Sequence, residues 1–288
     1  MKVLVTGVKG QLGYDVVNEL NKRNHQAIGV DIEDLDITDA KSVESVISDV
    51  NPEAVIHCAA WTAVDSAEDE INRETVRRVN VDGTQNIACV CKKLGCKMMY
   101  ISTDYVFGGQ GSAPWKPDCK DYAPLSVYGQ TKLEGELCVA NTLDQYFVVR
   151  IAWVFGINGR NFVKTMLSLS DKYETLRVVN DQIGTPTYTY DLARLLVDMI
   201  ETDRYGYYHA TNEGGYISWA EFAEEIFRQA HKSTIVIPVT TAEYGVSKAV
   251  RPFNSRLDKT KLIENGFDPL PKWQDALARY LVEIENNG

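Results

Sequence analysis

A tyrosine and a lysine four positions apart, Tyr128 and Lys132, have the side chains best suited to acid–base chemistry. Residues 126–141 have helical periodicity, and residues four apart share one face of a helix, so the two polar groups point the same way. A free tyrosine has a pKa of about 10, too high for efficient proton transfer at neutral pH. Because a lysine ammonium, like any positive charge nearby, favours the phenolate, we expect a lowered pKa for Tyr128. An exposed helix can show the same spacing by chance.

A hydroxyl group, Thr103, lies just beyond residues 98–102, a short apolar run that predicts a strand. Doubly wound sheets build their sites at the carboxyl ends of strands, so Thr103 is expected near Tyr128. There it could donate a hydrogen bond to a substrate carbonyl oxygen and share its polarisation with Tyr128.

A glycine-rich loop between the first predicted strand, Val3–Thr6, and the first predicted helix, Gln11–Asn24, is typical of a dinucleotide site. Its glycines let the backbone approach a pyrophosphate, and the helix N-terminus offers unpaired N–H groups. A simple tight turn is the alternative. The residues predicted to bind the coenzyme here are Gly7, Gly10, Gln11, Leu12 and Gly13.

Asp31 ends the predicted second strand, where a carboxylate would bind the adenosine ribose hydroxyls and repel a 2′-phosphate. This favours NADH over NADPH, although Lys9 could accept that phosphate. Asp36 and Ile37 could flank the adenine. After the third strand, small side chains would allow close approach to the nicotinamide ribose, or simply a close helix–strand contact. The residues predicted at this end are Ala59, Ala60 and Thr62.

Strands alternate with helices over the first 150 residues, which predicts an α/β fold with a doubly wound parallel sheet, the Rossmann fold. The predicted strands are Val3–Thr6, Gln26–Val30, Ala54–Cys58, Met98–Ser102 and Phe147–Arg150. Residues 151–288 predict a smaller, mainly helical substrate-binding lobe, with helices at 190–201, 218–231, 258–265 and 272–285. We expect residues 1–150 and 151–288 to pack as one body, with some crossing of the chain between the lobes.

The formal net charge is −10, from 40 acidic and 30 basic residues, which argues against general electrostatic binding to nucleic acid or an anionic membrane. No apolar run reaches the roughly 18 residues that span a bilayer, and the N-terminal strand leaves no room for a signal peptide, so we expect a cytoplasmic protein. The cysteines form no C-x-x-C pair and are expected to be reduced and buried, with a disulfide or metal site as the alternative. They are Cys58, Cys89, Cys91, Cys96, Cys119 and Cys138.

With these pieces, the chain resembles the extended short-chain dehydrogenase/reductase superfamily, and within it the dTDP-4-dehydrorhamnose reductases. The resemblance covers nearly the whole chain and rests on five stretches in the family's order. They are Ala59–Glu68 (AAWTAVDSAE), Ser102–Phe107 (STDYVF), Arg150–Gly156 (RIAWVFG), Asp181–Thr187 (DQIGTPT) and Arg251–Leu257 (RPFNSRL).

The resemblance implies reduction of the C4 keto group of a nucleotide-linked 6-deoxysugar by NAD(P)H, dTDP-4-dehydro-L-rhamnose to dTDP-L-rhamnose. Thr103, Tyr128 and Lys132 would be catalytic, with Tyr128 supplying the proton and Lys132 holding the ribose. Asp104 would contact the sugar, and Trp153 would place an apolar face against it, unless it is an ordinary core residue. Arg251 would suit the diphosphate, since its planar fork matches phosphate geometry; a surface salt bridge is the competing interpretation.

Two alternatives remain open at this point. A nucleotide-sugar epimerase or dehydratase could share the scaffold, but dehydratases carry Asp-Glu after the threonine, whereas Tyr105 follows Asp104 here. A non-catalytic, nucleotide-binding regulatory subunit would often lose part of the catalytic set, which is complete here. Some family members are metal-assisted dimers, which leaves a homodimer open, but no ligand cluster in the sequence indicates a metal.

Overall fold

A six-stranded parallel sheet forms the centre of the computed structural model, which describes residues 1–245 and 247–287. The predicted doubly wound α/β fold is confirmed, and the five predicted strands match observed ones to within one residue at each end. In spatial order the strands are β10 (Gly206–His209), β5 (Tyr146–Ile151), β4 (Lys97–Thr103), β3 (Ala54–His57), β1 (Lys2–Thr6) and β2 (Gln26–Val30).

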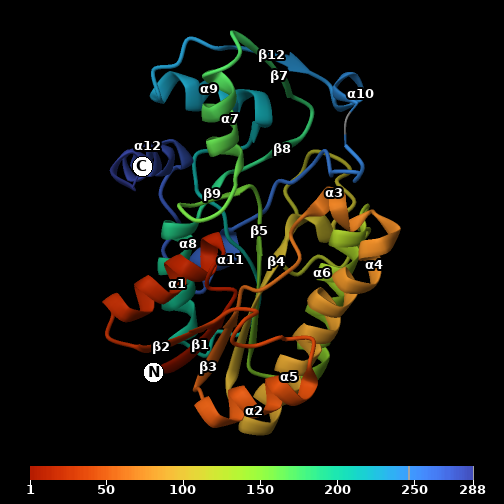
Figure 1. Cartoon of the computed structure of the whole chain (residues 1–288), viewed down its shortest axis with the longest axis vertical. Coiled ribbons are helices and arrows are strands. Elements are labelled where there is room, and N and C mark those ends of the chain that lie inside the picture. The colour runs from red at the N-terminus through yellow and green to blue at the C-terminus, as the bar shows by residue number, and fades with distance from the viewer. Residues whose placement is uncertain (246, 288) are drawn as a thin grey trace.

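Helices cover both faces of the sheet (Figure 1). Successive strand residues point to opposite faces, so Val3 and Val5 enter one apolar core and Leu4 enters the other. The first core lies under α1 (Gln11–Lys22), α8 (Thr189–Ile200) and α11 (Thr260–Glu264). The second lies under α2 (Ala40–Val50), α5 (Gly83–Leu94) and α6 (Val127–Thr142). Ahead of α5 come α3 (Val64–Ala67), α4 (Glu70–Arg77) and a π-helical turn, Arg78–Asp82.

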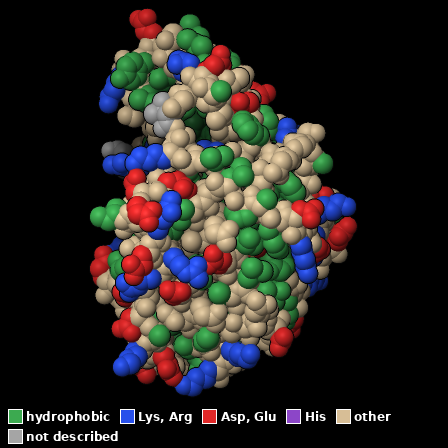
Figure 2. Space-filling model, turned by 90° about the vertical axis from the view of Figure 1, so that its right-hand side faces the viewer, with side chains coloured by type: hydrophobic (Ala, Val, Ile, Leu, Met, Phe, Trp, Pro, Cys, Tyr) green, Lys and Arg blue, Asp and Glu red, His purple; other side chains and the backbone are tan. Residues whose placement is uncertain are grey.

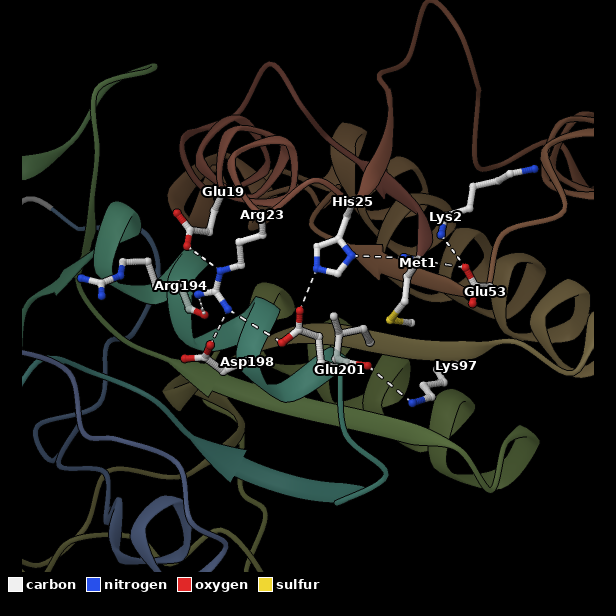
Figure 3. A network of polar contacts seen from close by, with 11 residues as sticks. Met1, Lys2, Glu19, Arg23, His25, Glu53, Lys97, Arg194, Asp198 and Glu201 are labelled. Carbon is white, nitrogen blue, oxygen red and sulfur yellow. Dashed lines mark hydrogen bonds and ion pairs between the residues drawn. The ribbon is translucent and has the colours of Figure 1, made fainter.

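Residues far beyond position 150 complete this layer, because α8 packs against α1 and β10 pairs with β5. A polar network at the end of α1 secures α8 there (Figure 3). Arg23 donates a hydrogen bond to the Arg194 carbonyl at 3.1 Å, and His25 Nε2 lies 2.7 Å from a carboxylate oxygen of Glu201. The chain therefore crosses between the sheet and the second lobe more than once.

The second lobe lies beyond the carboxyl ends of the strands and has its own aromatic core, which includes Phe155, Phe222 and Tyr280. The lobe contains β6 (Val154–Phe155), α7 (Phe162–Ser170), β7 (Thr175–Val179), β8 (Ile183–Gly184), β9 (Thr187–Tyr188), β11 (Ile217–Ser218), α9 (Trp219–Gln229), β12 (Ile235–Val239), α10 (Thr241–Tyr244) and α12 (Trp273–Asn287). The predicted helices of this region are present as α8, α9, α11 and α12. Helices α7 and α10 and the strand pairs β6–β9, β7–β12 and β8–β11 were not predicted, because they are short and follow loop-like sequence.

Acidic and basic side chains are interspersed over the face shown in Figure 2, with apolar side chains gathered between them. All six cysteines are free; Cys91 and Cys96 are buried, whereas Cys89 is exposed, so the expectation of buried thiols holds only in part. Among the described residues, no helix has both the length and the apolar character needed to cross a membrane.

Candidate functional site

A cleft of about 520 Å³ opens at the carboxyl ends of the sheet strands. It is lined by the glycine loop, by the segments that follow β2, β3, β4 and β5, and by one face of α6. All but one of the predicted site residues line it. They are Gly7, Gly10, Gln11, Leu12, Gly13, Asp31, Asp36, Ile37, Ala59, Ala60, Thr62, Thr103, Asp104, Tyr128, Lys132 and Trp153.

The backbone of the glycine loop packs so tightly against neighbouring backbone atoms that side chains at Gly7 and Gly13 would not fit. Gly7 has a φ of 72°, and a Cβ there would lie 2.7 Å from the Ala59 nitrogen. A Cβ on Gly13 would lie 2.3 Å from the Gly7 carbonyl oxygen. Helix α1 begins after Gly10 with no side-chain cap, which leaves its first N–H groups facing the cleft. The loop therefore has the exposed backbone and the uncapped helix start that a pyrophosphate site requires.

The Asp31 carboxylate is held by the backbone at the end of β2. It accepts hydrogen bonds from the Lys9 N–H at 2.8 Å and from the Ile32 N–H at 2.9 Å. The Lys9 ammonium pairs with Glu33 at 2.7 Å, so its charge has a carboxylate partner. The end of the cleft that Asp31 lines therefore carries negative charge.

Tyr128 is half-buried and Lys132 is buried on one face of α6, and the loss of contact with water governs the titration of both. Burial raises the pKa of Tyr128, an effect that the hydrogen bond with Thr103 opposes and Asp104 reinforces. The predicted lowering is thus wrong for the chain alone, because loss of water disfavours the phenolate more than its neighbours favour it. Burial also lowers the pKa of Lys132 to about 7, against the opposing effect of Glu136.

Lys132 is fixed by its surroundings. Its Nζ donates a hydrogen bond to the Ile101 carbonyl at 2.7 Å and lies 4.0 Å from the centre of the Tyr100 ring. A cation over an aromatic face is attracted to the ring, which offsets part of the cost of burial. These two contacts hold the Lys132 side chain in one conformation, with its Nζ atom at the wall of the cleft.

Thr103 is the last residue of β4, and Asp104 begins the short 3-10 helix Asp104–Val106 that follows; both lie close to Tyr128. The Thr103 hydroxyl donates to Asp104 Oδ1 at 3.0 Å, whereas Asp104 Oδ2 is buried without a hydrogen-bond partner among the described residues. Burial raises the pKa of Asp104 to about 6, although Ser255 and Thr103 oppose the change. An unpaired buried oxygen is costly, and in a cleft it is suited to a ligand hydroxyl.

A buried ion pair that sequence reasoning missed lies beneath these groups. Glu136, one turn after Lys132, accepts hydrogen bonds from Arg150 Nε at 2.8 Å and Nη2 at 2.7 Å, and from the Ser102 hydroxyl at 2.5 Å. Arg150 also donates to the Pro117 carbonyl at 3.0 Å. Both charged side chains are completely buried.

A second missed residue is Asn80, in the π-helical turn before α5. Its side chain accepts from the Trp61 N–H at 2.8 Å and donates to the Thr131 hydroxyl at 3.0 Å. It thus joins the loop after β3 to α6 between Tyr128 and Lys132. The only sequence signal for this role was a polar residue, Asn80, in the middle of a long helical pattern. A polar residue at such a place can indicate that the helix is interrupted, as the π-helical turn interrupts it here.

Arg251 is the one predicted site residue that does not line the cleft. Its Nη2 and Nη1 atoms lie 2.7 Å and 3.2 Å from the two Asp65 carboxylate oxygens. Asp65 also accepts hydrogen bonds from the Ser247 hydroxyl at 3.1 Å and the Ala249 N–H at 3.0 Å. The structure therefore places Arg251 in the competing arrangement, a partly exposed salt bridge, beside the cleft-lining Tyr105.

Comparison with known proteins gives one consistent result. Residues 1–286 match the family described as the RmlD substrate binding domain. The chain is 38% identical to the spore coat polysaccharide biosynthesis protein SpsK of Bacillus subtilis, over 98% of this chain and 97% of that protein. It is 39% identical to the dTDP-4-dehydrorhamnose reductase of Aggregatibacter actinomycetemcomitans, over 99% of each.

A solved structure agrees with these relatives. The dTDP-4-dehydrorhamnose reductase of Bacillus anthracis, in complex with NADP, superposes with a TM-score of 0.93 at 41% identity. The alignment covers 98% of this chain and 100% of that one. The family resemblance stated from the sequence motifs is thereby confirmed.

The buried carboxyl of Asp104 gives a pH-dependent prediction. The pKa of Asp104 is higher in the folded than in the unfolded chain. Its favourable contribution to the free energy of unfolding is therefore fully present below about pH 4 and is lost as the pH rises through about 6. Asp104→Asn should therefore stabilise the protein at neutral pH by roughly 2–3 kcal/mol, with no gain below about pH 4. Urea unfolding across this range measures the difference. Asp49→Asn, on the exposed end of α2, is the control, and a constant difference at every pH would contradict the prediction.

Proposed function

Because the chain belongs to the RmlD substrate binding domain family, we propose that it reduces the C4 keto group of dTDP-4-dehydro-L-rhamnose to give dTDP-L-rhamnose. The chain is an oxidoreductase of the short-chain dehydrogenase/reductase type that uses a nicotinamide coenzyme. The observation that carries the proposal is one cleft in which Thr103, Tyr128 and Lys132 lie together beyond a glycine loop shaped for a pyrophosphate.

The coenzyme, when bound, supplies a hydride for the keto carbon. Its pyrophosphate would lie against Gly7, Gly10 and Gly13 at the start of α1, and Asp31 would accept hydrogen bonds from the adenosine ribose. The Asp31 carboxylate and the paired Lys9 support NADH as the preferred coenzyme. The relative from Bacillus anthracis binds NADP, so this preference is a feature proposed for this chain.

Tyr128 supplies the proton that the reduced oxygen needs. A phenol is protonated at neutral pH even at its ordinary pKa, so Tyr128 is in the form that an acid for ketone reduction requires. The Thr103 hydroxyl, which donates to Asp104 Oδ1 in the structure, would turn its one proton to the developing alkoxide and thereby spread its charge. The ammonium of Lys132, fixed over Tyr100, holds the ribose hydroxyls and favours the phenolate that remains after proton transfer.

The cleft gives no support to a dehydratase or to a regulatory subunit. A dehydratase needs an acid next to Asp104, but Tyr105 occupies that position and packs edge-on against the Tyr128 ring, with 5.5 Å between centres. A regulatory subunit would not need the complete set of Thr103, Tyr128 and Lys132. The six free cysteines support a reducing, cytoplasmic location as part of the proposal.

The proposed reaction is tested by mixing the protein with NADH or NADPH and the dTDP-4-keto sugar, made in situ by the upstream enzymes. Coenzyme oxidation coupled to formation of a dTDP-6-deoxyhexose is the expected result, faster with NADH. Protein that binds NADH but oxidises neither coenzyme would refute the proposed substrate.

Replacement of Tyr128 by Phe should reduce turnover by about 10²–10⁴, the range for loss of a general acid, because only the hydroxyl is removed. The KM for coenzyme should stay within threefold of wild type, since the ring is kept. Tyr146→Phe, on β5 outside the cleft, is the matched control. Turnover of Tyr128→Phe within threefold of wild type would remove Tyr128 from the chemistry.

Replacement of Asp31 by Ala should shift coenzyme preference toward NADPH, because it removes both the ribose acceptor and the charge that repels a 2′-phosphate. The ratio of kcat/KM for NADH to that for NADPH should fall by about tenfold or more. Glu53→Ala, a carboxylate beside the amino ends of β1 and β3, is the control. An unchanged ratio would show that Asp31 does not discriminate between the coenzymes.

A further inference from the structure

The backbone at Trp153 adopts a conformation that bulky residues rarely accept. Its φ is 52°, in the left-handed region, between the extended strands β5 and β6. Thr187 fixes the backbone on both sides: its N–H donates to the Trp153 carbonyl at 3.1 Å and its hydroxyl to the Ala152 carbonyl at 2.5 Å. Strain of this kind persists only where the surroundings determine the conformation, and it gathers at binding and catalytic sites.

Two residues of the second lobe confine the Trp153 indole. Trp219 stacks on it with 3.7 Å between ring centres and 13° between the planes. Gly184 lies against its edge, since a Cβ on Gly184 would lie 2.7 Å from Trp153 Cε2. Phe162 in turn contacts the Trp219 ring, with 4.6 Å between centres. The indole that lines the cleft therefore has little freedom to move.

The two confining residues are held at a fixed spacing by one small sheet. Gly184 of β8 pairs with Ile217 of β11, and the chain turns from β11 directly into α9, whose first residue is Trp219. Ser218 caps this helix through a complete capping box with Glu221, which fixes where α9 begins. Gly184 and Trp219 thus lie at the two ends of this short ladder, and both contact Trp153.

We propose that Trp219 is a positioning residue for the reduction: together with Gly184 it holds Trp153 in its strained conformation, so that the indole forms a rigid wall for the sugar. The inference rests on the proposed function, in which Trp153 contacts the sugar. An indole that is already held in place loses little conformational entropy when the sugar binds to it, so the stack with Trp219 strengthens substrate binding. Because the wall acts alike on ground and transition state, its loss raises KM rather than lowering kcat.

Substitutions at the two confining residues test the proposal from independent directions. Trp219→Ala should raise the KM for the nucleotide sugar about tenfold, with kcat and the Kd for NADH within threefold of wild type. Trp219→Phe should restore most of the affinity, because a phenyl ring still stacks. Gly184→Ala should raise the same KM, because its methyl group displaces the indole.

Trp273→Phe is the matched control, since Trp273 is a buried tryptophan of the same core that contacts Phe222 but not Trp153. It should lower the Tm and leave the KM for the nucleotide sugar within twofold of wild type. Equal changes of KM in Trp219→Ala and Trp273→Phe would show that Trp219 contributes to the stability of the lobe and does not position Trp153. An unchanged KM in Trp219→Ala would overturn the proposal while leaving the reductase activity intact.

A spectroscopic readout tests the stack without turnover, so failure of the proposed substrate would not obscure it. Two stacked indoles share a near-ultraviolet circular dichroism signal, and replacement of either indole by a phenyl ring should abolish it. The changes caused by Trp153→Phe and Trp219→Phe should therefore exceed in sum the change in the double variant. Strictly additive changes would show that the rings do not act as a pair.

Discussion

The buried pair of Glu136 and Arg150 determines where helix α6 lies on the sheet. Two charges removed from water are tolerated only if nearly every donor and acceptor finds a partner. Here those partners come from β4, β5 and the 117–122 segment, and His209 of β10 lies 3.3 Å from Arg150. One placement of α6 satisfies them together. Since α6 carries Tyr128 and β4 ends at Thr103, the same placement brings the two hydroxyls together.

Much of the fold and most of the cleft could be predicted from sequence, because the signals are local. The alternation of apolar strands and helices identified the five strands of residues 1–150. Gly7 and Gly13 indicated a loop with no room for side chains, and the structure explains each by a backbone atom that a Cβ would strike. The spacing of Tyr128 and Lys132 fixed their common face, since a helix makes that relation certain.

What could not be predicted depends on contacts between distant segments. Burial reverses the expected pKa change of Tyr128, and the degree of burial follows from packing that no motif records. Arg251 pairs with Asp65, although each lies in a stretch that was singled out separately. Asn80 joins two segments through its side-chain amide, and its role is invisible until the segments are adjacent. Sequence patterns identify elements well and the pairings of their polar side chains poorly.

The first lobe is completed by α8 and β10, which come late in the sequence, and this order affects the folding of the chain during its synthesis. When Ile151 is added to the chain, every residue of the glycine loop and of α6 has been synthesised, but α8 and β10 have not. Leu20 and Phe147 then lack the apolar partners that α8 and β10 bring, such as Leu196 and Tyr208. A nascent chain at this stage exposes a sheet edge and an apolar face, the features that chaperones recognise. A fragment cut at this point would inherit the same exposed surfaces, so the coenzyme-binding half is no transferable module.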